Sequence, residues 1–295
     1  ILILFIIINF FFYIKNYSSI KLEIPKIFIL IIFILFLLTL LPPLDADSLD
    51  YHFSGPLEIL KFEKILKPND FYWLHFRLLS SGEMMSLLGL ALGSYSFGQL
   101  IQFSGLIIIL INFLYLSKRN KYKFNYFIFI LSLPILISLI SSHKPTLFQS
   151  SIIFTSIVLC LDLYEKYSRL KVLIIFALLE FAVISKISFI IPAIPVFLFT
   201  LYIIIRNKKI FQEFLILIPL SIFLLAPLPL KNYLIWGEPL TPFYHFYDHE
   251  KQNYIDLWLN HLVVGEYKSS LSNIFSSIKN LIIPFRLSEF SQVLG

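Results

Sequence analysis

Residues 172–205 read VLIIFALLEFAVISKISFIIPAIPVFLFTLYIII and contain only two charged side chains, Glu180 and Lys186. Crossing about 30 Å of hydrocarbon takes roughly 20 helical residues, and the apolar runs on either side of Lys186 approach that length. Within lipid, every backbone N–H and C=O group must pair inside its own segment or in a closed barrel. Unbroken runs of Leu, Ile and Phe lack the alternation of barrel strands, so this stretch predicts two transmembrane helices.

The same apolar pattern recurs along the whole chain. Of the 295 residues, 58% are hydrophobic and 14% are charged, and the mean hydropathy is +0.83. A soluble domain is about half apolar and about a quarter charged, so the composition excludes a water-soluble fold. We predict an all-α fold, a polytopic bundle of transmembrane helices. The expected spans are residues 1–13, 27–44, 97–116, 124–142, 147–164, 172–185, 187–205 and 211–230.

Lysine and arginine residues gather in alternate connections between these spans, the pattern expected of loops on the cytoplasmic face. The net charge of +6 therefore reports topology rather than a nucleic-acid partner, and membrane lipids are the expected surroundings. The remaining connections face outward, and two of them are long, residues 45–96 and 231–295. The basic residues are Lys15, Lys21, Lys26, Lys118, Arg119, Lys121, Lys123, Lys166, Arg169, Lys171, Arg206, Lys208 and Lys209.

We expect residues 1–295 to form a single transmembrane domain, a fragment of a longer chain, because residues 1–13 are too short to span. Two segments outside the spans, 56–67 and 271–282, carry apolar residues at helical spacing. Each is predicted to be an amphipathic helix on the outer membrane surface. The single cysteine, Cys160, excludes an internal disulfide, and the sequence contains no metal motif such as HExxH or CxxC.

The most informative polar stretch is LDADSLDYH, residues 44–52, which follows the Pro42-Pro43 pair at the end of a span. Its charged or titratable side chains are Asp45, Asp47, Asp50 and His52. In one interpretation these carboxylates merely solvate a helix end. In the other, one of them is a general base that deprotonates an acceptor hydroxyl or amine as it attacks an activated sugar carbon. The outer end of a span is where a lipid-borne donor and a water-borne acceptor can meet.

Residues 45–56, DADSLDYHFSGP, resemble the first outer loop of the GT-C superfamily of membrane glycosyltransferases in its bacterial branch. That branch includes enzymes of the protein mannosyltransferase and aminoarabinose transferase type. In it, a WDalxYHlxxP pattern follows the first conserved span. Asp47 takes the position of the family's aspartate, and Tyr51, His52 and Pro56 follow in register.

Further segments resemble the same family in the same order. Glu83 opens GEMMSLLGLALGSYSFGQL, similar to the family's helix that starts with glutamate before the next span. Lys186 in ISKISFIIPAIP is similar to a TKytglllp stretch. Residues 231–244, KNYLIWGEPLTPFY, are similar to RNyxxtGNPxyPf, with Lys231 where the family has arginine.

The resemblance implies a GT-C-like fold and inverting transfer of a sugar from a polyprenyl-phosphate donor. The acceptor would be a glycan, a lipid or a protein on the outer, periplasmic face of a bacterial inner membrane. Asp47 would be the general base, with Asp45 beside it as a second catalytic candidate. The resemblance requires no cofactor, and dependence on a divalent cation stays open.

The resemblance also implies substrate-binding residues, each with a structural alternative. Lys231 would hold the donor phosphate, with Lys186 as a second candidate, whereas either lysine would otherwise extend to the headgroups. Glu83 would orient the acceptor or bind a cation, or would only favour a helix start. His52 would orient Asp47 or assist a metal, or would form a structural hydrogen bond. The substrate-binding candidates are Asp50, His52, Glu83, Lys186, Lys231 and Asn232.

Two other classes stay open. A multi-span transporter or lipid flippase without glycosyl transfer should carry charged or broken spans at the midplane, whereas here the ionisable residues gather at the outer boundary. A catalytically inactive relative that serves as an assembly partner is the third hypothesis. His143 and Lys144 are expected in a solvated outer turn. Glu180 lies inside an apolar run and is functional only if it faces the bundle interior.

Overall fold

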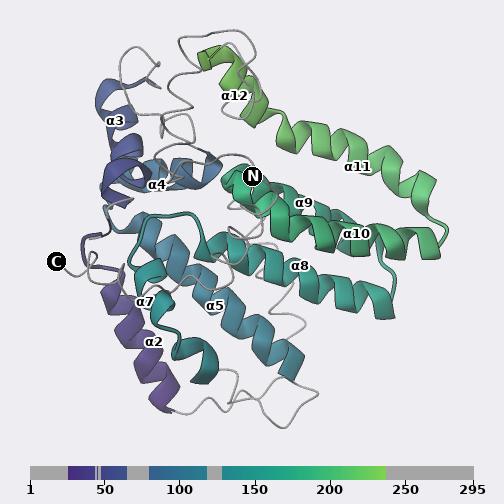
Figure 1. Ribbon diagram of the computed structural model, residues 1–295, viewed down its shortest axis with the longest axis horizontal. Coiled ribbons are helices and arrows are strands. Elements are labelled where there is room, and N and C mark those ends of the chain that lie inside the picture. Colours follow the sequence, from purple (N-terminus) through teal and green to yellow (C-terminus); the bar gives the residue numbers. More distant parts are fainter. Residues whose placement is uncertain (1–25, 44, 46–47, 65–79, 118–127, 237–295) are drawn as a thin grey trace, which may run out of the picture. The chain divides into compact units, whose positions relative to one another are not determined.

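The computed structural model describes residues 26–43, 45, 48–64, 80–117 and 128–236, and all regular secondary structure in these ranges is helical (Figure 1). The described residues belong to one compact unit, Ile1–Leu240; the second unit, Thr241–Gly295, lies outside the described residues. The elements are α2 (Lys26–Leu38), η1 (Ser48–His52), α3 (Ser54–Phe62), α4 (Ser81–Ala91), α5 (Phe97–Ser117), α7 (Pro134–Ile140), α8 (Leu147–Glu165), α9 (Arg169–Ser185), η4 (Ile187–Phe189), α10 (Ile190–Arg206), α11 (Ile210–Leu225) and α12 (Pro227–Trp236).

Four helical segments are long and apolar enough to cross a membrane. They are Phe97–Leu116, Leu147–Glu165, Ile187–Arg206 and Ile210–Leu234. Each coincides with a span predicted from the sequence, which confirms the all-α prediction for the described part of the chain. Pro195 inside α10 and Pro219 inside α11 leave both helices continuous, as membrane helices tolerate.

Two predicted spans are shorter than expected, and prolines explain both. The span predicted at 27–44 becomes α2, which ends at Leu38, because the chain tightens into turns before Pro42 and Pro43. The span predicted at 124–142 breaks at Leu133, which is extended before Pro134, the first residue of α7. The predicted span 1–13 lies outside the described residues.

The predicted amphipathic helix at 56–67 is present as α3, but it starts and ends earlier. It ends at Phe62 because Glu63 adopts a left-handed conformation with φ of 53°. Its buried residues include Pro56 and Ile59, while Lys61 and Phe62 are exposed. The second predicted amphipathic helix, 271–282, lies outside the described residues.

The main packing pairs are α5 against α8, α8 against α9 and α10, and α9 against α11 (Figure 1). A central apolar core lies among α8, α9 and α10, where the side chains of Leu163, Val172, Ile175, Ala182 and Ile204 have no exposed surface. A second apolar cluster, which includes Leu106 and Ile140, joins α2, α5 and α7. Both apolar cores therefore lie along the lengths of the helices, and polar residues occupy the helix ends.

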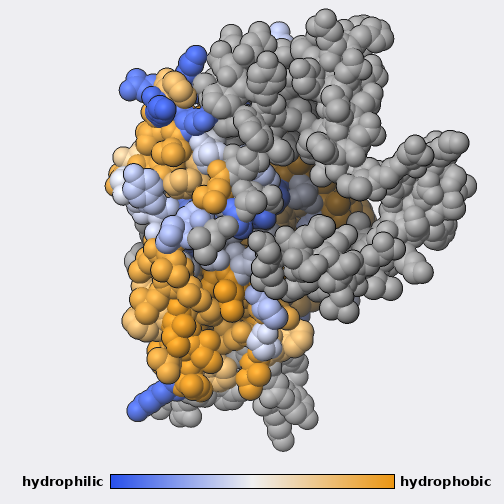
Figure 2. All heavy atoms as spheres, turned by 60° about the vertical axis from the view of Figure 1, so that its left-hand side comes forward, coloured by the Kyte–Doolittle hydropathy of each residue, from blue (hydrophilic) through white to orange (hydrophobic). Residues whose placement is uncertain are grey.

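The outer surface of the helices is strongly apolar. Figure 2 shows a broad hydrophobic area on the face that carries α2, bordered by a band of hydrophilic residues. The exposed fraction is 75% at Phe211, 73% at Ile191 and 67% at Phe223, values that large apolar side chains rarely sustain in water. Such a surface is suited to contact with lipid tails.

Candidate functional site

The alternating directions of the helices bring five segments of the chain to one end of the bundle. Their described residues are 39–43, 45 and 48–62, 80–98, 141–149, 185–190 and 231–232. At the other end lie the basic connections, tied by Arg206 over the Tyr164 ring at 4.8 Å and by Lys171 with Asp162 at 3.6 Å. One end of the bundle is therefore basic, and the other, which we call the polar end, carries mixed charges and amides.

His52 and Glu83 form a buried pair at the polar end. His52 closes η1 and Glu83 lies in the first turn of α4, and each is 2% exposed. The Nδ1 atom of His52 is 2.8 Å from Oε1 of Glu83. The other carboxylate oxygen accepts the backbone N–H of Ser80 at 2.7 Å and its hydroxyl at 2.5 Å. Glu83 therefore completes a capping box at the start of α4, as its helix-start interpretation expects, and it also binds His52.

Two of the predicted cations lie at the same end. Lys231, on α12, interacts electrostatically with Glu83, although the two residues are far apart in the sequence. Lys186, at the end of α9, donates a hydrogen bond to the Thr146 hydroxyl at 3.3 Å. Asn232, next to Lys231, is 4% exposed. The sequence predicted an outer loop that begins at residue 231. In the structure, helix α12 continues through this position and places Lys231 and Asn232 at the polar end.

The turn at 142–144 holds the first outer segment in place. The hydroxyls of Ser48 and Ser142 are 2.9 Å apart, and the backbone N–H of His143 donates to the Ser48 hydroxyl at 2.9 Å. The Lys144 ammonium is 3.5 Å from the Asp45 carboxylate. Partial burial alone would raise the pKa of Asp45, but the hydrogen bonds from Ser48, the Lys144 charge and the Ser142 hydroxyl outweigh it and lower that pKa.

The expectation that His143 lies in a solvated turn is wrong. His143 is 2% exposed, and its ring meets the Phe53 ring edge-on with centroids 4.9 Å apart. A Cβ at Gly98 would lie 2.3 Å from Nδ1 of His143, so only glycine leaves room for this ring. The turn is buried because η1, α4 and the start of α5 close over it, which no local sequence signal reports.

Burial lowers the pKa of His143 to about 4, with a smaller contribution from His52, against the opposing effects of Asp45 and the Tyr95 backbone carbonyl. The imidazole is therefore neutral near pH 7. The polar end thus contains a neutral histidine beside the His52–Glu83 pair.

Two glutamines of α5 anchor this architecture, and the sequence interpretation missed both. Gln99 donates to the backbone carbonyls of Leu41 at 2.9 Å and Ser141 at 2.7 Å, which fixes the ends of α2 and α7. Gln102 accepts backbone N–H groups at the start of α8. The sequence signal that could have identified them is two glutamines, three positions apart, inside an apolar helix. Such residues face protein rather than lipid.

The structure does not describe every predicted site residue. Asp47 lies outside the described residues, as does the side chain of Asp50, whose backbone belongs to η1. His52 and Glu83 are in direct contact, Lys231 interacts electrostatically with Glu83, and Asp45 and His52 both act electrostatically on His143. Across the residues that the structure describes, no group of three His, Cys, Asp or Glu side chains is arranged to hold a metal ion.

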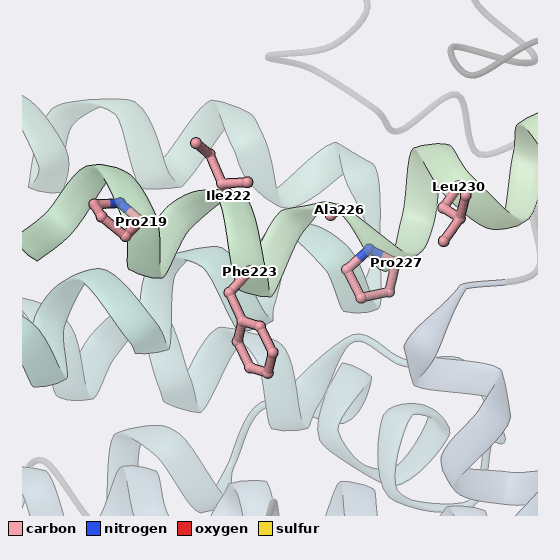
Figure 3. A pocket seen from close by; sticks show the side chains of 6 residues that line it. All are labelled: Pro219, Ile222, Phe223, Ala226, Pro227 and Leu230. Atoms are coloured by element: carbon pink, nitrogen blue, oxygen red, sulfur yellow. The ribbon is translucent and has the colours of Figure 1, made fainter.

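An apolar groove lies beside the polar end. Its volume is about 610 Å³, and its lining comes from α11, α12 and the residue that joins them (Figure 3). The lining residues are Pro219, Ile222, Phe223, Ala226, Pro227 and Leu230. Leu230, at one end of this lining, directly precedes Lys231 in α12.

These features define the chain as a helical membrane protein with a buried polar site at one end of its bundle. The chain belongs to the family described as DUF1420 N-terminal domain, which matches residues 1–236. No curated protein and no solved structure matches the chain. The matched range contains every described helix and the whole polar end.

Proposed function

We propose that the chain is the membrane part of a glycosyltransferase that moves a sugar from a polyprenyl-phosphate donor to a glycan, lipid or protein acceptor. The transfer takes place on the outer face of a bacterial inner membrane. Asp47 is the general base, with Asp45 close to it in the sequence, and Lys231 binds the donor phosphate. The proposal follows the GT-C resemblance of residues 45–56 and 231–244.

The observation that carries the proposal is the linked set of ionisable side chains at the polar end. Asp45 and His52 both interact with His143, His52 binds Glu83, and Glu83 interacts with Lys231. A carboxylate, an imidazole and a cation together supply groups for proton transfer and for binding a phosphate. The basic opposite end, by the positive-inside rule, supports an outward-facing polar end.

The groove on α11 and α12 supports a lipid-linked donor. Its lining is apolar, which suits a polyprenyl tail, and Leu230 of that lining directly precedes Lys231 in the sequence. A donor with its tail in the groove would carry its phosphate towards that cation. Lysine offers a point charge rather than the bidentate fork of arginine, which is sufficient to stabilise a leaving phosphate.

The chemistry requires three bond changes. Asp47 removes the proton of the acceptor hydroxyl, and the hydroxyl oxygen attacks the anomeric carbon of the donor sugar. The bond from that carbon to the phosphate oxygen breaks, and the phosphate leaves with the electron pair. Negative charge grows on the leaving oxygen, so a positioned cation such as Lys231 lowers the barrier.

One observation favours a transporter or lipid flippase as a second candidate. Glu180, within α9, accepts a hydrogen bond from the Ser221 hydroxyl of α11, so it faces a neighbouring helix. A carboxyl group between two membrane helices is a frequent feature of ion and substrate pathways. Glu180→Gln should abolish function in a transporter and leave sugar transfer close to wild type in a transferase.

The direct test is sugar transfer by the full-length protein in lipid nanodiscs, with a polyprenyl-phosphate sugar as donor. Wild-type protein should transfer the sugar, Asp47→Asn should lose roughly 100-fold or more in rate, and Lys231→Gln should lose more than Lys231→Arg. Lys61→Gln, an exposed lysine of α3, is the matched control and should behave as wild type. Equal rates for wild type and Asp47→Asn would remove the base from the mechanism, and no transfer by wild type would refute the reaction class.

A further inference from the structure

Two turns at the basic end of the bundle are tied to each other. One joins α8 to α9, and the other joins α10 to α11 (Figure 1). Arg206, at the end of α10, lies over the Tyr164 ring at 4.8 Å. Arg169, at the start of α9, donates to the backbone carbonyl of Gln212 at 3.1 Å and lies 3.6 Å from the Glu213 carboxylate. The two turns therefore form one surface, which we call the basic surface and which consists of residues 162–171 and 204–213.

The basic surface carries more cations than carboxylates. Glu213 is 2% exposed and pairs with Arg169, while the Asp162 carboxylate lies 3.6 Å from the Lys171 ammonium. Glu165 is the third carboxylate in these segments. The cations outside those two ion pairs are all exposed, and they are Lys166, Arg206, Lys208 and Lys209. An excess of positive charge therefore lies on the outside of both turns.

Lys208 occupies a backbone position that usually belongs to glycine. The Lys209 N–H donates to the Ile204 carbonyl at 3.2 Å, and the Lys208 N–H donates to the Ile205 carbonyl at 2.9 Å. These are the two hydrogen bonds of a Schellman motif at the end of α10. Lys208 is left-handed, with φ of 55°, a conformation that costs free energy for a residue with a Cβ atom. A lysine held there against the backbone preference indicates a use for its charge.

Exposed apolar side chains lie next to the exposed cations in the chain. On α10, Tyr202 and Ile205 are each 53% exposed and precede Arg206 by no more than four positions. On α11, Phe211 is 75% exposed and follows Lys209 by two positions. A soluble anion would contact the charges alone, whereas a phospholipid offers a phosphate to the cations and acyl chains to the apolar side chains. The combination therefore favours a lipid headgroup.

We propose that the basic surface is a binding site for an anionic phospholipid of the cytoplasmic leaflet, whose phosphate is bound by Arg206, Lys208 and Lys209. By the positive-inside rule this end faces the cytoplasm, where acidic lipids give the leaflet a negative surface potential. Lys166 of the neighbouring turn adds to the positive field, and the contact between Arg206 and Tyr164 joins the two turns. This inference concerns the end opposite the polar end and does not depend on the proposed glycosyl transfer.

The test titrates phosphatidylglycerol, an anionic phospholipid, into the purified full-length protein in neutral detergent and follows the thermal unfolding transition. The transition of wild type should rise with phosphatidylglycerol and much less with the same mole fraction of zwitterionic phosphatidylcholine. Combining Lys208→Gly with Lys209→Gln should raise the mole fraction needed for half of the shift by roughly tenfold or more. Lys61→Gln, at an exposed lysine of α3, is the matched control and should respond as wild type.

Two variants at Lys208 separate the charge from the turn. Lys208→Gly should fold at least as stably as wild type, because glycine favours the left-handed conformation, yet it should respond more weakly to phosphatidylglycerol. Lys208→Arg retains the charge and should retain the response. Equal shifts of wild type with the two lipids, or an equal loss in Lys61→Gln, would overturn the inference. A shift of the same size with inorganic phosphate would also overturn it, since the surface would then bind a soluble anion.

Discussion

The side-chain oxygen of Gln102 on α5 lies 2.9 Å from the backbone nitrogen of Leu147 at the start of α8. The same oxygen accepts the N–H groups of Thr146 at 3.2 Å and Phe148 at 3.1 Å. Thr146 occupies the N-cap position but makes no capping hydrogen bond with its own side chain. A neighbouring helix therefore supplies the cap of α8, and the cap fixes where the polar end begins.

Replacing Gln102 by Met should destabilise the protein by about 1–3 kcal/mol, because buried N–H groups at the start of α8 lose their acceptor while the side-chain volume is kept. The loss is measured as a shift in the unfolding transition of the purified protein in detergent. Gln212→Met, an exposed position on α11, is the control and should change stability by less than about 0.5 kcal/mol. Equal losses in the two variants would contradict the capping role.

Gly105 of α5 lies against the backbone of α8, and a Cβ there would be 2.6 Å from the Cα of Phe148. Helix propensity predicts that Gly105→Ala stabilises the helix by about 0.5–1 kcal/mol. The structure predicts the opposite sign, because the contact is with backbone and the helices must separate. Thermal unfolding in detergent decides between them. A stabilised Ala variant would show that the approach of α5 and α8 is looser than described.

The Asp45–Lys144 pair tests whether the 142–144 turn holds the first outer segment. The double-mutant cycle uses Asp45→Asn, Lys144→Gln and both together, with unfolding free energies measured in detergent at low and high salt. Both side chains are partly exposed, so the coupling energy should be about 0.2–1 kcal/mol and should decrease with salt. Additive effects of the two single changes would mean that the pair does not contribute to stability.

The spans at 97–116, 147–164, 187–205 and 211–230 could be predicted because hydrophobic length is a local property of the sequence. The ends of two other predicted spans, 27–44 and 124–142, were harder to predict. The chain stops being helical at Leu38 and again at Leu133, where prolines act within runs that remain apolar. A hydropathy argument counts apolar residues and does not register that a backbone N–H is missing.

At the candidate site, too, the sequence indicated individual residues but not the contacts between residues that are far apart in the chain. His52 and Glu83 could be singled out as polar residues at the outer boundary, but their pairing joins residues 31 positions apart. The burial of His143 depends on Ser48, which is 95 positions away, and on the missing side chain of Gly98. Only the packing of the helices creates these contacts, so the turn was expected to be solvated.

His143 gives the last prediction, the dependence of stability on pH. Its pKa is about 4 in the folded protein and 6.5 in an exposed chain, so the unfolded state takes a proton first as the pH falls. The stabilisation is complete above pH 6.5 and is lost between pH 6.5 and 4, by about 3 kcal/mol in total. Melting temperatures in detergent should therefore fall more steeply over this range in wild type than in His143→Gln.

Asp45, whose pKa is also lowered, acts in the same direction as His143. Asp45 and the other histidines are present in both proteins, so the difference between the two melting curves reports His143 alone. Parallel curves for the two proteins would show that the His143 ring is protonated, or exposed, in the folded state.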